Sequence, residues 1–135
     1  NKTATGTSIF MNLPPSSFSG IPELTEFPKE ICSMDDVNQV MIISNKIASI
    51  PPEIAKMKSL TNLNLSGNAL ESLPAEIGQL TQLKKLNISN NPLSDFPSEI
   101  GQLQNLKKLN LKNTKLSKEQ QDELQTLLPN CKINF

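Results

Sequence analysis

The sequence predicts an α/β fold, a short curved solenoid in which a concave parallel sheet is backed by short helical turns. Two observations predict it. Equivalent segments recur every 23 residues, as Leu60 and Leu83 illustrate. Each repeat joins a period-two apolar stretch, typical of a strand, to apolar residues at helical spacing. Such units bury their apolar side chains by stacking on one another, which produces a solenoid.

The strand half of the repeat occurs four times. The segments read VNQVMIISNKI, LTNLNLSGNAL, LKKLNISNNPL and LKKLNLKNTKL, beginning at Val37, Leu60, Leu83 and Leu106. In the second segment, the period of two places Leu63 and Leu65 on one face of a strand and Asn64 on the other. We therefore expect the leucines inside and the residues between them on an open sheet face.

The helical half follows as SIPPEIAKM, SLPAEIGQL and DFPSEIGQL, with a further half-repeat, EFPKEICSM, nearer the N-terminus. Leu73, Ile77 and Leu80 have helical spacing, and Pro74 suits the first position of a helical turn because its missing N–H costs nothing there. Glutamates recur early in these turns, where they complement the positive end of the helix. We assign a structural role to Glu53, Glu76 and Glu99.

Asparagines recur where each strand turns outward. Asn45, Asn68 and Asn91 occupy equivalent positions, and a side-chain amide there can satisfy backbone groups of the turn and of the next repeat. We expect a structural asparagine ladder. Thr114 takes the last position and can replace only part of this bonding.

The sequence divides into residues 1–36, 37–116 and 117–135. The first part is an N-terminal segment, cap and partial repeat, in which residues 1–8 are polar and Ile9–Phe18 form an irregular apolar cap. Truncation of a longer array is the alternative for this end. The chain begins without Met, and both an arbitrary boundary and signal-peptide removal remain open.

The last part, residues 117–135, is predicted to be a capping helix and an edge strand. Ser117 is a candidate N-cap with Gln120 three residues later. Leu124, Leu127 and Leu128 follow on one helical face. The strand is expected around Cys131–Phe135, with Cys131 in the position of Leu109 and with Ile133 and Phe135 buried.

The two cysteines are expected to be free and buried. Cys32 occupies the position of Ala55, Gly78 and Gly101, a tight contact between repeats. At about 4.8 Å per parallel strand, Cys32 and Cys131 lie roughly 20 Å apart, too far for a disulfide.

The pattern LxxLxLxxNxL followed by LPxxIxxL resembles the leucine-rich repeat in its 23-residue form. The wording LPxEIGQLxxLKKLNL and the ending LLPNCKINF are similar to bacterial leucine-rich repeat proteins of the leptospiral type. The resemblance implies a protein-binding module, secreted or exposed on a bacterial surface, that engages host molecules.

Composition argues against other classes. The chain has 13 lysines, 13 acidic residues, zero net charge, no His and no Arg. Without His, the commonest general base and metal ligand are missing. We therefore expect no catalytic residues, no metal, no cofactor, no nucleic-acid partner and, since no long apolar run occurs, no membrane span.

The strand positions between the fixed leucines form the candidate binding surface. These residues change from apolar to neutral polar to basic along the stack. They are Gln39, Met41, Ile43, Asn62, Asn64, Ser66, Lys85, Asn87, Ser89, Lys108, Asn110 and Lys112.

Two alternatives stay open on this surface. Met41 and Ile43 either lie under the N-terminal segment or form a hydrophobic anchor for a partner. The lysines either solubilise the protein or attract an acidic protein or glycan patch.

We expect a non-enzymatic protein-binding module, monomeric rather than oligomeric, although strands at the two ends offer edges for pairing. A cytoplasmic scaffold or regulatory subunit, whose repeats read similarly, is the alternative. A recognition domain detached from an effector enzyme is a further one.

Overall fold

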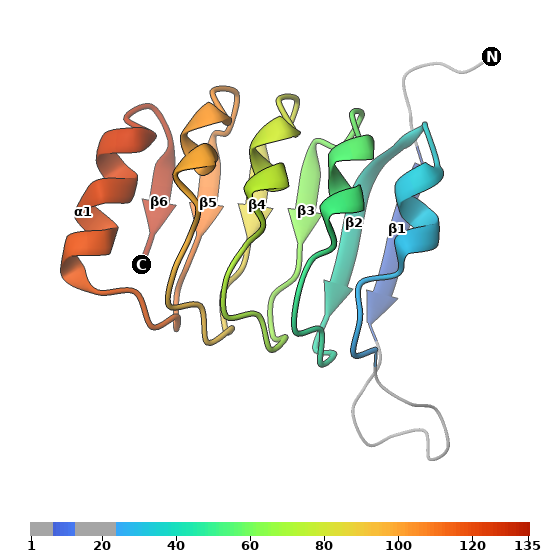
Figure 1. The fold of residues 1–135 in the computed structure, drawn as a ribbon, viewed down its shortest axis with the longest axis horizontal. Helices are drawn as coiled ribbons and strands as arrows, with labels where there is room; N and C mark the ends of the chain where they lie inside the picture. The colour runs from blue at the N-terminus through green and yellow to red at the C-terminus, as the bar shows by residue number, and fades with distance from the viewer. Residues whose placement is uncertain (1–6, 13–23) are drawn as a thin grey trace.

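The computed structural model describes residues 7–12 and 24–135. In these residues, six parallel strands form one sheet in the order of the sequence. A layer of short helices lies in front of the strands (Figure 1). The predicted curved solenoid is confirmed. The strands are β1 (Thr7–Asn12), β2 (Val37–Ile43), β3 (Asn62–Asn64), β4 (Lys85–Asn87), β5 (Lys108–Asn110) and β6 (Lys132–Asn134).

The helical layer consists of four 3₁₀ helices and one α-helix. They are η1 (Lys29–Ser33), η2 (Pro52–Lys56), η3 (Ala75–Gln79), η4 (Ser98–Gln102) and α1 (Lys118–Leu127). A proline in extended conformation precedes each 3₁₀ helix, as Pro74 does for η3 with φ −76° and ψ 155°. Pro74 thus lies one residue before the expected first helical position, and its ring restricts φ at the point where the chain enters the turn.

The core runs along the whole solenoid between the two layers. Leu63, Leu86 and Leu109 stand opposite one another in β3, β4 and β5. All three are at most 1% exposed. Ile54, Ile77 and Ile100 cover them from the helical layer and are equally buried. Each repeat shares this core with its neighbours, which is how a 23-residue unit becomes stable.

The expected asparagine ladder is present. Asn68 donates from Nδ2 to the carbonyl oxygens of Ile42 (2.8 Å) and Leu65 (2.9 Å). Its Oδ1 accepts the N–H of Ile47 at 3.1 Å. Asn91 repeats this pattern one row later. Thr114 reproduces the bond within its own row, from Oγ1 to the carbonyl oxygen of Leu111 at 2.8 Å.

Backbone with positive φ recurs just before each ladder position. Ser44, Gly67, Asn90 and Asn113 have φ of 61°, 72°, 58° and 58°. This left-handed conformation is easy for Gly, tolerated by Asn and unfavourable for Ser. The same turn is therefore built from residues of different intrinsic fitness.

The N-terminal segment differs from the expectation. Thr7–Asn12 is a regular strand, β1, that pairs in parallel with β2, placing Phe10 opposite Met41 and Asn12 opposite Ile43. The predicted irregular cap is therefore wrong for residues 9–12, and Thr7 and Ser8 belong to the sheet. The rest of the expected cap, residues 13–18, lies outside the described residues, as do residues 1–6.

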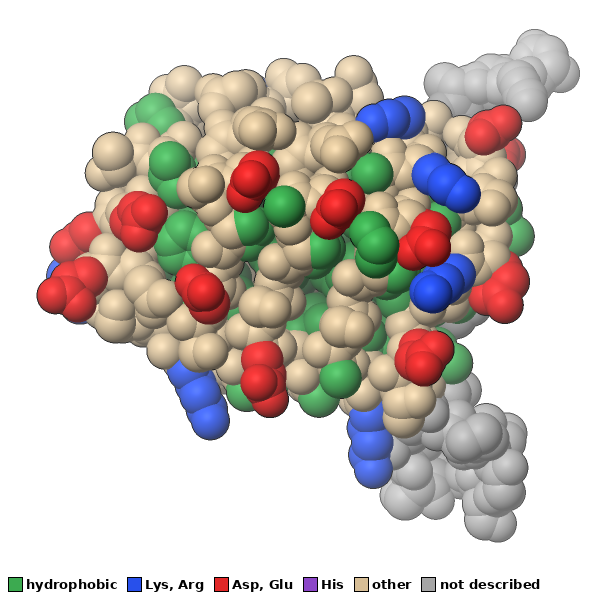
Figure 2. Space-filling view, viewed as in Figure 1, with side chains coloured by type: hydrophobic (Ala, Val, Ile, Leu, Met, Phe, Trp, Pro, Cys, Tyr) green, Lys and Arg blue, Asp and Glu red, His purple; other side chains and the backbone are tan. Residues whose placement is uncertain are grey.

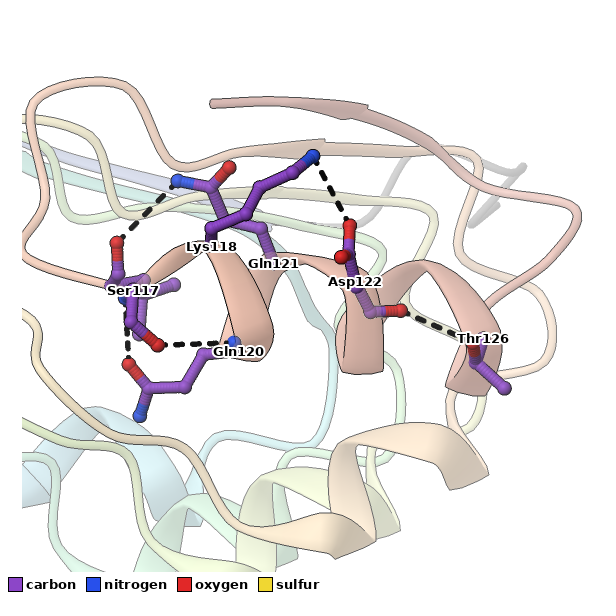
Figure 3. A network of polar contacts seen from close by, with 7 residues as sticks. Ser117, Lys118, Gln120, Gln121, Asp122 and Thr126 are labelled. Atoms are coloured by element: carbon purple, nitrogen blue, oxygen red, sulfur yellow. Dashed lines mark hydrogen bonds and ion pairs between the residues drawn. The ribbon is translucent and has the colours of Figure 1, made fainter.

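At the other end, Ser117 caps α1 as expected. Its Oγ accepts the N–H of Gln120 at 3.1 Å, and the Gln120 side chain accepts the N–H of Ser117 at 2.8 Å (Figure 3). Leu124 and Leu128 are buried and Leu127 packs partly against the core. This helix therefore covers the core beside η4.

The last strand corrects two expectations. Ile133, not Cys131, stands opposite Leu109, because the last row is one residue longer than the repeat. Phe135 is 41% exposed rather than buried. Ile133 is only partly buried, packed against the edge of the core.

Both cysteines are free and buried, at opposite ends of the solenoid. Cys32 lies in η1 and Cys131 directly precedes β6. Burial raises the pKa of both thiols, and the nearby Glu53 carboxylate adds to the effect at Cys32.

Candidate partner-binding surface

The sheet face opposite the helices carries two rows of side chains that run across the strands. The register aligns each member with the next strand's equivalent. We call Gln39, Asn62, Lys85, Lys108 and Lys132 the first row. The second row is Met41, Asn64, Asn87, Asn110 and Asn134. Together they are the concave surface.

The rows arise from strand geometry. In β3, β4 and β5 the middle residue is a buried leucine, so the residues on either side of it project to the opposite face. The sequence KLN therefore places one lysine and one asparagine per strand on the concave surface. Parallel, in-register pairing then brings like next to like.

Lysines occupy the C-terminal half of the first row. Lys85 stands opposite Lys108, and Lys108 opposite Lys132, and all three are exposed. In the part of the chain that the structure describes, no carboxylate forms an ion pair with any of them. This end of the surface therefore carries uncompensated positive charge, which favours an acidic partner.

The N-terminal half of the first row is neutral and internally bonded. Asn62 Nδ2 donates to Gln39 Oε1 at 3.2 Å, and Gln39 Nε2 donates to Ser8 Oγ at 3.4 Å. Ser8 belongs to β1, so this strand extends the surface beyond the predicted residues.

The second row has an apolar end and a long amide stretch. Met41 and Ile43 in β2 are half-buried, and Met41 lines a shallow groove of about 300 Å³ on this face. The groove continues past Asn64, Lys85, Asn87, Lys108, Asn110 and Asn134. β1 lies beside Met41 without closing the groove.

Three residues of the predicted surface lie beyond the strands. Ser66, Ser89 and Lys112 follow β3, β4 and β5 in the turns. Ser89 is only 6% exposed and donates from Oγ to Asn87 Oδ1 at 2.6 Å. The prediction that Ser89 faces a partner is therefore wrong, whereas Ser66 is half-buried and Lys112 remains exposed.

Sequence reasoning missed Lys132 and Asn134. The signal was present, because Lys132-Ile133-Asn134 has the same alternation as Lys108-Leu109-Asn110. Aligning Cys131 with the repeat leucines concealed it. The structure adds both residues to the basic end of the surface.

The helical face has the opposite character. Acidic side chains spread over it in the view of Figure 2. Those in the first turns are Glu30, Glu53, Glu76 and Glu99, as predicted for the last three. The zero net charge therefore conceals a separation of lysines on the sheet face from carboxylates on the helical face.

Two structural searches bear on other functions. Within residues 7–12 and 24–135, no group of three or more Cys, Asp or Glu residues is placed to hold a metal ion. Over the same residues, no helix combines the length and apolarity needed to cross a membrane.

Comparison with known proteins establishes the class. The model of the leucine-rich repeat region matches residues 23–130. Because this match covers most of the chain, the protein belongs to the leucine-rich repeat family, whose members are typically non-catalytic protein-binding modules.

Among solved structures, a leucine-rich repeat protein of Leptospira interrogans is similar at 40% identity and a TM-score of 0.82. The alignment covers 84% of this chain and 29% of that one, so the chain spans less than a third of the leptospiral structure. The resemblance to the bacterial, leptospiral type is thus confirmed.

Two Arabidopsis thaliana structures are similar at lower scores. The ectodomain of the receptor kinase GASSHO1/SCHENGEN3, in complex with Casparian strip integrity factor 2, has 29% identity and a TM-score of 0.62, covering 67% of this chain and 11% of that one. A chain of the BIR3–SERK2 complex has 31% identity and a TM-score of 0.62, covering 68% and 51%. Among curated proteins, no sequence matches significantly.

Proposed function

We propose that this chain is a non-enzymatic module that binds a protein partner on its concave surface. The single observation that carries the proposal is the in-register alignment of exposed, uncompensated lysines over buried leucines. A row of side chains held on a rigid sheet is pre-organised, so binding loses little conformational entropy. The similar plant ectodomain, solved with a bound factor, provides support from a related repeat.

The test is the double variant Lys85→Glu with Lys108→Glu. We expect a folded protein whose binding to a captured and then purified partner is weakened and loses its dependence on salt. The matched control is Lys58→Glu with Lys115→Glu, which makes the same charge change at exposed positions outside the concave surface. Equal binding by both double variants would mean that the lysines only solubilise the protein.

For location, we propose a secreted or cell-surface bacterial protein that engages host molecules, as the leptospiral resemblance implies. An intracellular scaffold is the alternative. Protease treatment of intact cells distinguishes them, because a surface protein is degraded while a cytoplasmic one survives. A monomer is proposed for the free chain, and sedimentation checks it.

A further inference from the structure

The second row of the concave surface presents a fixed chemical group. Asn64, Asn87 and Asn110 each accept, through Oδ1, the backbone N–H two residues later. The distances are 3.1, 3.0 and 3.1 Å. A backbone N–H can only donate, so the atom facing it must be the carboxamide oxygen. The amide orientation is therefore determined by the turn.

The consequence is that Nδ2 of each asparagine faces away from this bond. Among the described residues, Nδ2 of Asn64, Asn87 and Asn110 has no acceptor. Each nitrogen carries two N–H groups, and all three residues line the groove. The second row thus offers donors at successive strands, while its acceptor oxygens are used within the protein.

The first row adds donors of the same sign. Lys85, Lys108 and Lys132 carry ammonium groups that donate and cannot accept. Neighbouring strands lie about 4.8 Å apart, so Lys85 and Lys132 are separated by roughly 10 Å. The basic half of the groove therefore requires a ligand made of acceptors.

The apolar end sets the direction of the ligand. Met41 lines the groove in β2, three strands from Lys108 in β5. That separation is about 14 Å, which an extended chain covers in about four residues. An apolar side chain over Met41 and carboxylates over β4–β6 fit one continuous segment.

We infer that the concave surface selects an extended, carboxylate-rich protein segment with an apolar residue about four positions from its acidic run. The segment crosses the strands from β2 to β6. Its carboxylates accept N–H groups from the asparagines and the lysines, and charge-assisted bonds of this kind are the strong ones. A polyanionic glycan satisfies the donors but leaves Met41 without an apolar partner, so the protein segment is favoured. This inference rests on the proposed function and names its partner class.

The decisive variant is Asn87→Asp. An aspartate keeps an oxygen for the Ser89 N–H, so the turn is retained, but it replaces two donors by a negative oxygen. We expect affinity for a labelled peptide with one leucine and a distal run of glutamates to fall by about tenfold or more. The control Asn113→Asp lies outside the groove and should bind like the wild type.

Peptide variants test each part of the ligand. Replacing the glutamates by glutamines should abolish binding, and replacing the leucine by serine should weaken it by about fivefold to tenfold. In NMR spectra, the side-chain amide signals of Asn64, Asn87 and Asn110 should shift on titration, while those of the buried Asn68 and Asn91 should not. Equal binding of the glutamine peptide overturns the inference.

Other outcomes separate this inference from the proposed function. If a heparin fragment shifts the same amides and the peptides do not, the ligand is a glycan and the inference fails. If no acidic peptide binds, yet Lys85→Glu with Lys108→Glu abolishes capture of the purified partner, the proposed function stands and the acidic class is wrong. If that variant keeps the partner, the proposed function itself fails.

Discussion

Asn68 Nδ2 donates to the carbonyl oxygen of Ile42 at 2.8 Å, across 26 residues of sequence. The same side chain accepts the N–H of Ile47 at 3.1 Å. One asparagine therefore ties two adjacent repeats through donor and acceptor alike. Such a bond is structural, because Asn68 is only 9% exposed and its amide is fully used within the protein.

Asn68→Ala should lower the free energy of unfolding by roughly 1–3 kcal/mol, because it leaves buried backbone groups without partners. Urea denaturation followed by circular dichroism measures the change. Asn62→Ala is the matched control, since its one bond lies on the open face and its loss should cost less than about 0.5 kcal/mol. An unchanged unfolding midpoint for Asn68→Ala would show that the ladder contributes nothing.

Gly78→Ala should also destabilise the protein. A Cβ at this position collides with the backbone carbonyl oxygen of Glu99 in the next repeat. Overpacking against backbone typically costs about 1–3 kcal/mol. At Gly101, the equivalent Cβ meets the Leu127 side chain at 3.3 Å, which can move aside, so Gly101→Ala should be milder. Equal thermal shifts for the two variants would contradict this difference.

The sequence predicted the parts of the fold that repeat. The buried leucines and the asparagine ladder follow from the 23-residue period, because each position has the same neighbours in every row. Cys131 was misaligned because the capping helix lengthens the last row by one residue, which periodicity cannot anticipate. β1 was missed because its partner strand begins 30 residues later, beyond any local pattern.

The candidate surface was predicted in composition but not in chemistry. Alternation placed Asn64 and Asn87 on the open face, yet it could not reveal that the turn takes their oxygens. Burial of Ser89 depends on the same turn, since its hydroxyl bonds Asn87 instead of facing outward. These features come from bonds two residues apart in one particular loop geometry.

Ser44→Gly should stabilise the protein. Ser44 has φ 61°, where the Cβ of an L-residue costs about 1–2 kcal/mol, while glycine loses more chain entropy on folding. The expected net gain is about 0.5–1 kcal/mol. Thermal unfolding monitored by calorimetry provides the measurement. The reverse change one row later, Gly67→Ser, should lower the midpoint, and a shift of the same sign for both would refute the backbone explanation.

Ser117→Ala should loosen the C-terminal cap. It removes the Oγ that accepts the Gln120 N–H, and loss of such a cap costs about 1 kcal/mol. Hydrogen exchange should quicken in residues 118–127 before the central strands are affected, since the helix contacts mainly η4. Ser117→Asp retains an acceptor at the N-cap and should restore protection. Failure of this rescue would mean that the hydroxyl acts in another way.

Cys32 and Cys131 should resist alkylation by iodoacetamide while the protein is folded. The thiolate is the reacting form, and burial raises the pKa of both thiols, with the Glu53 carboxylate opposing ionisation at Cys32. The folded state therefore holds the thiol protons more tightly than the unfolded state. The sign follows: the free energy of unfolding should fall as the pH rises through the unfolded thiol pKa. Mass spectrometry at pH 8 should show slow labelling without denaturant and rapid labelling of both residues in urea. Cys32→Ala should remove part of the alkaline loss of stability, because the smaller residue occurs naturally at the equivalent position Ala55. Rapid labelling of the folded protein would contradict the buried placement of these side chains.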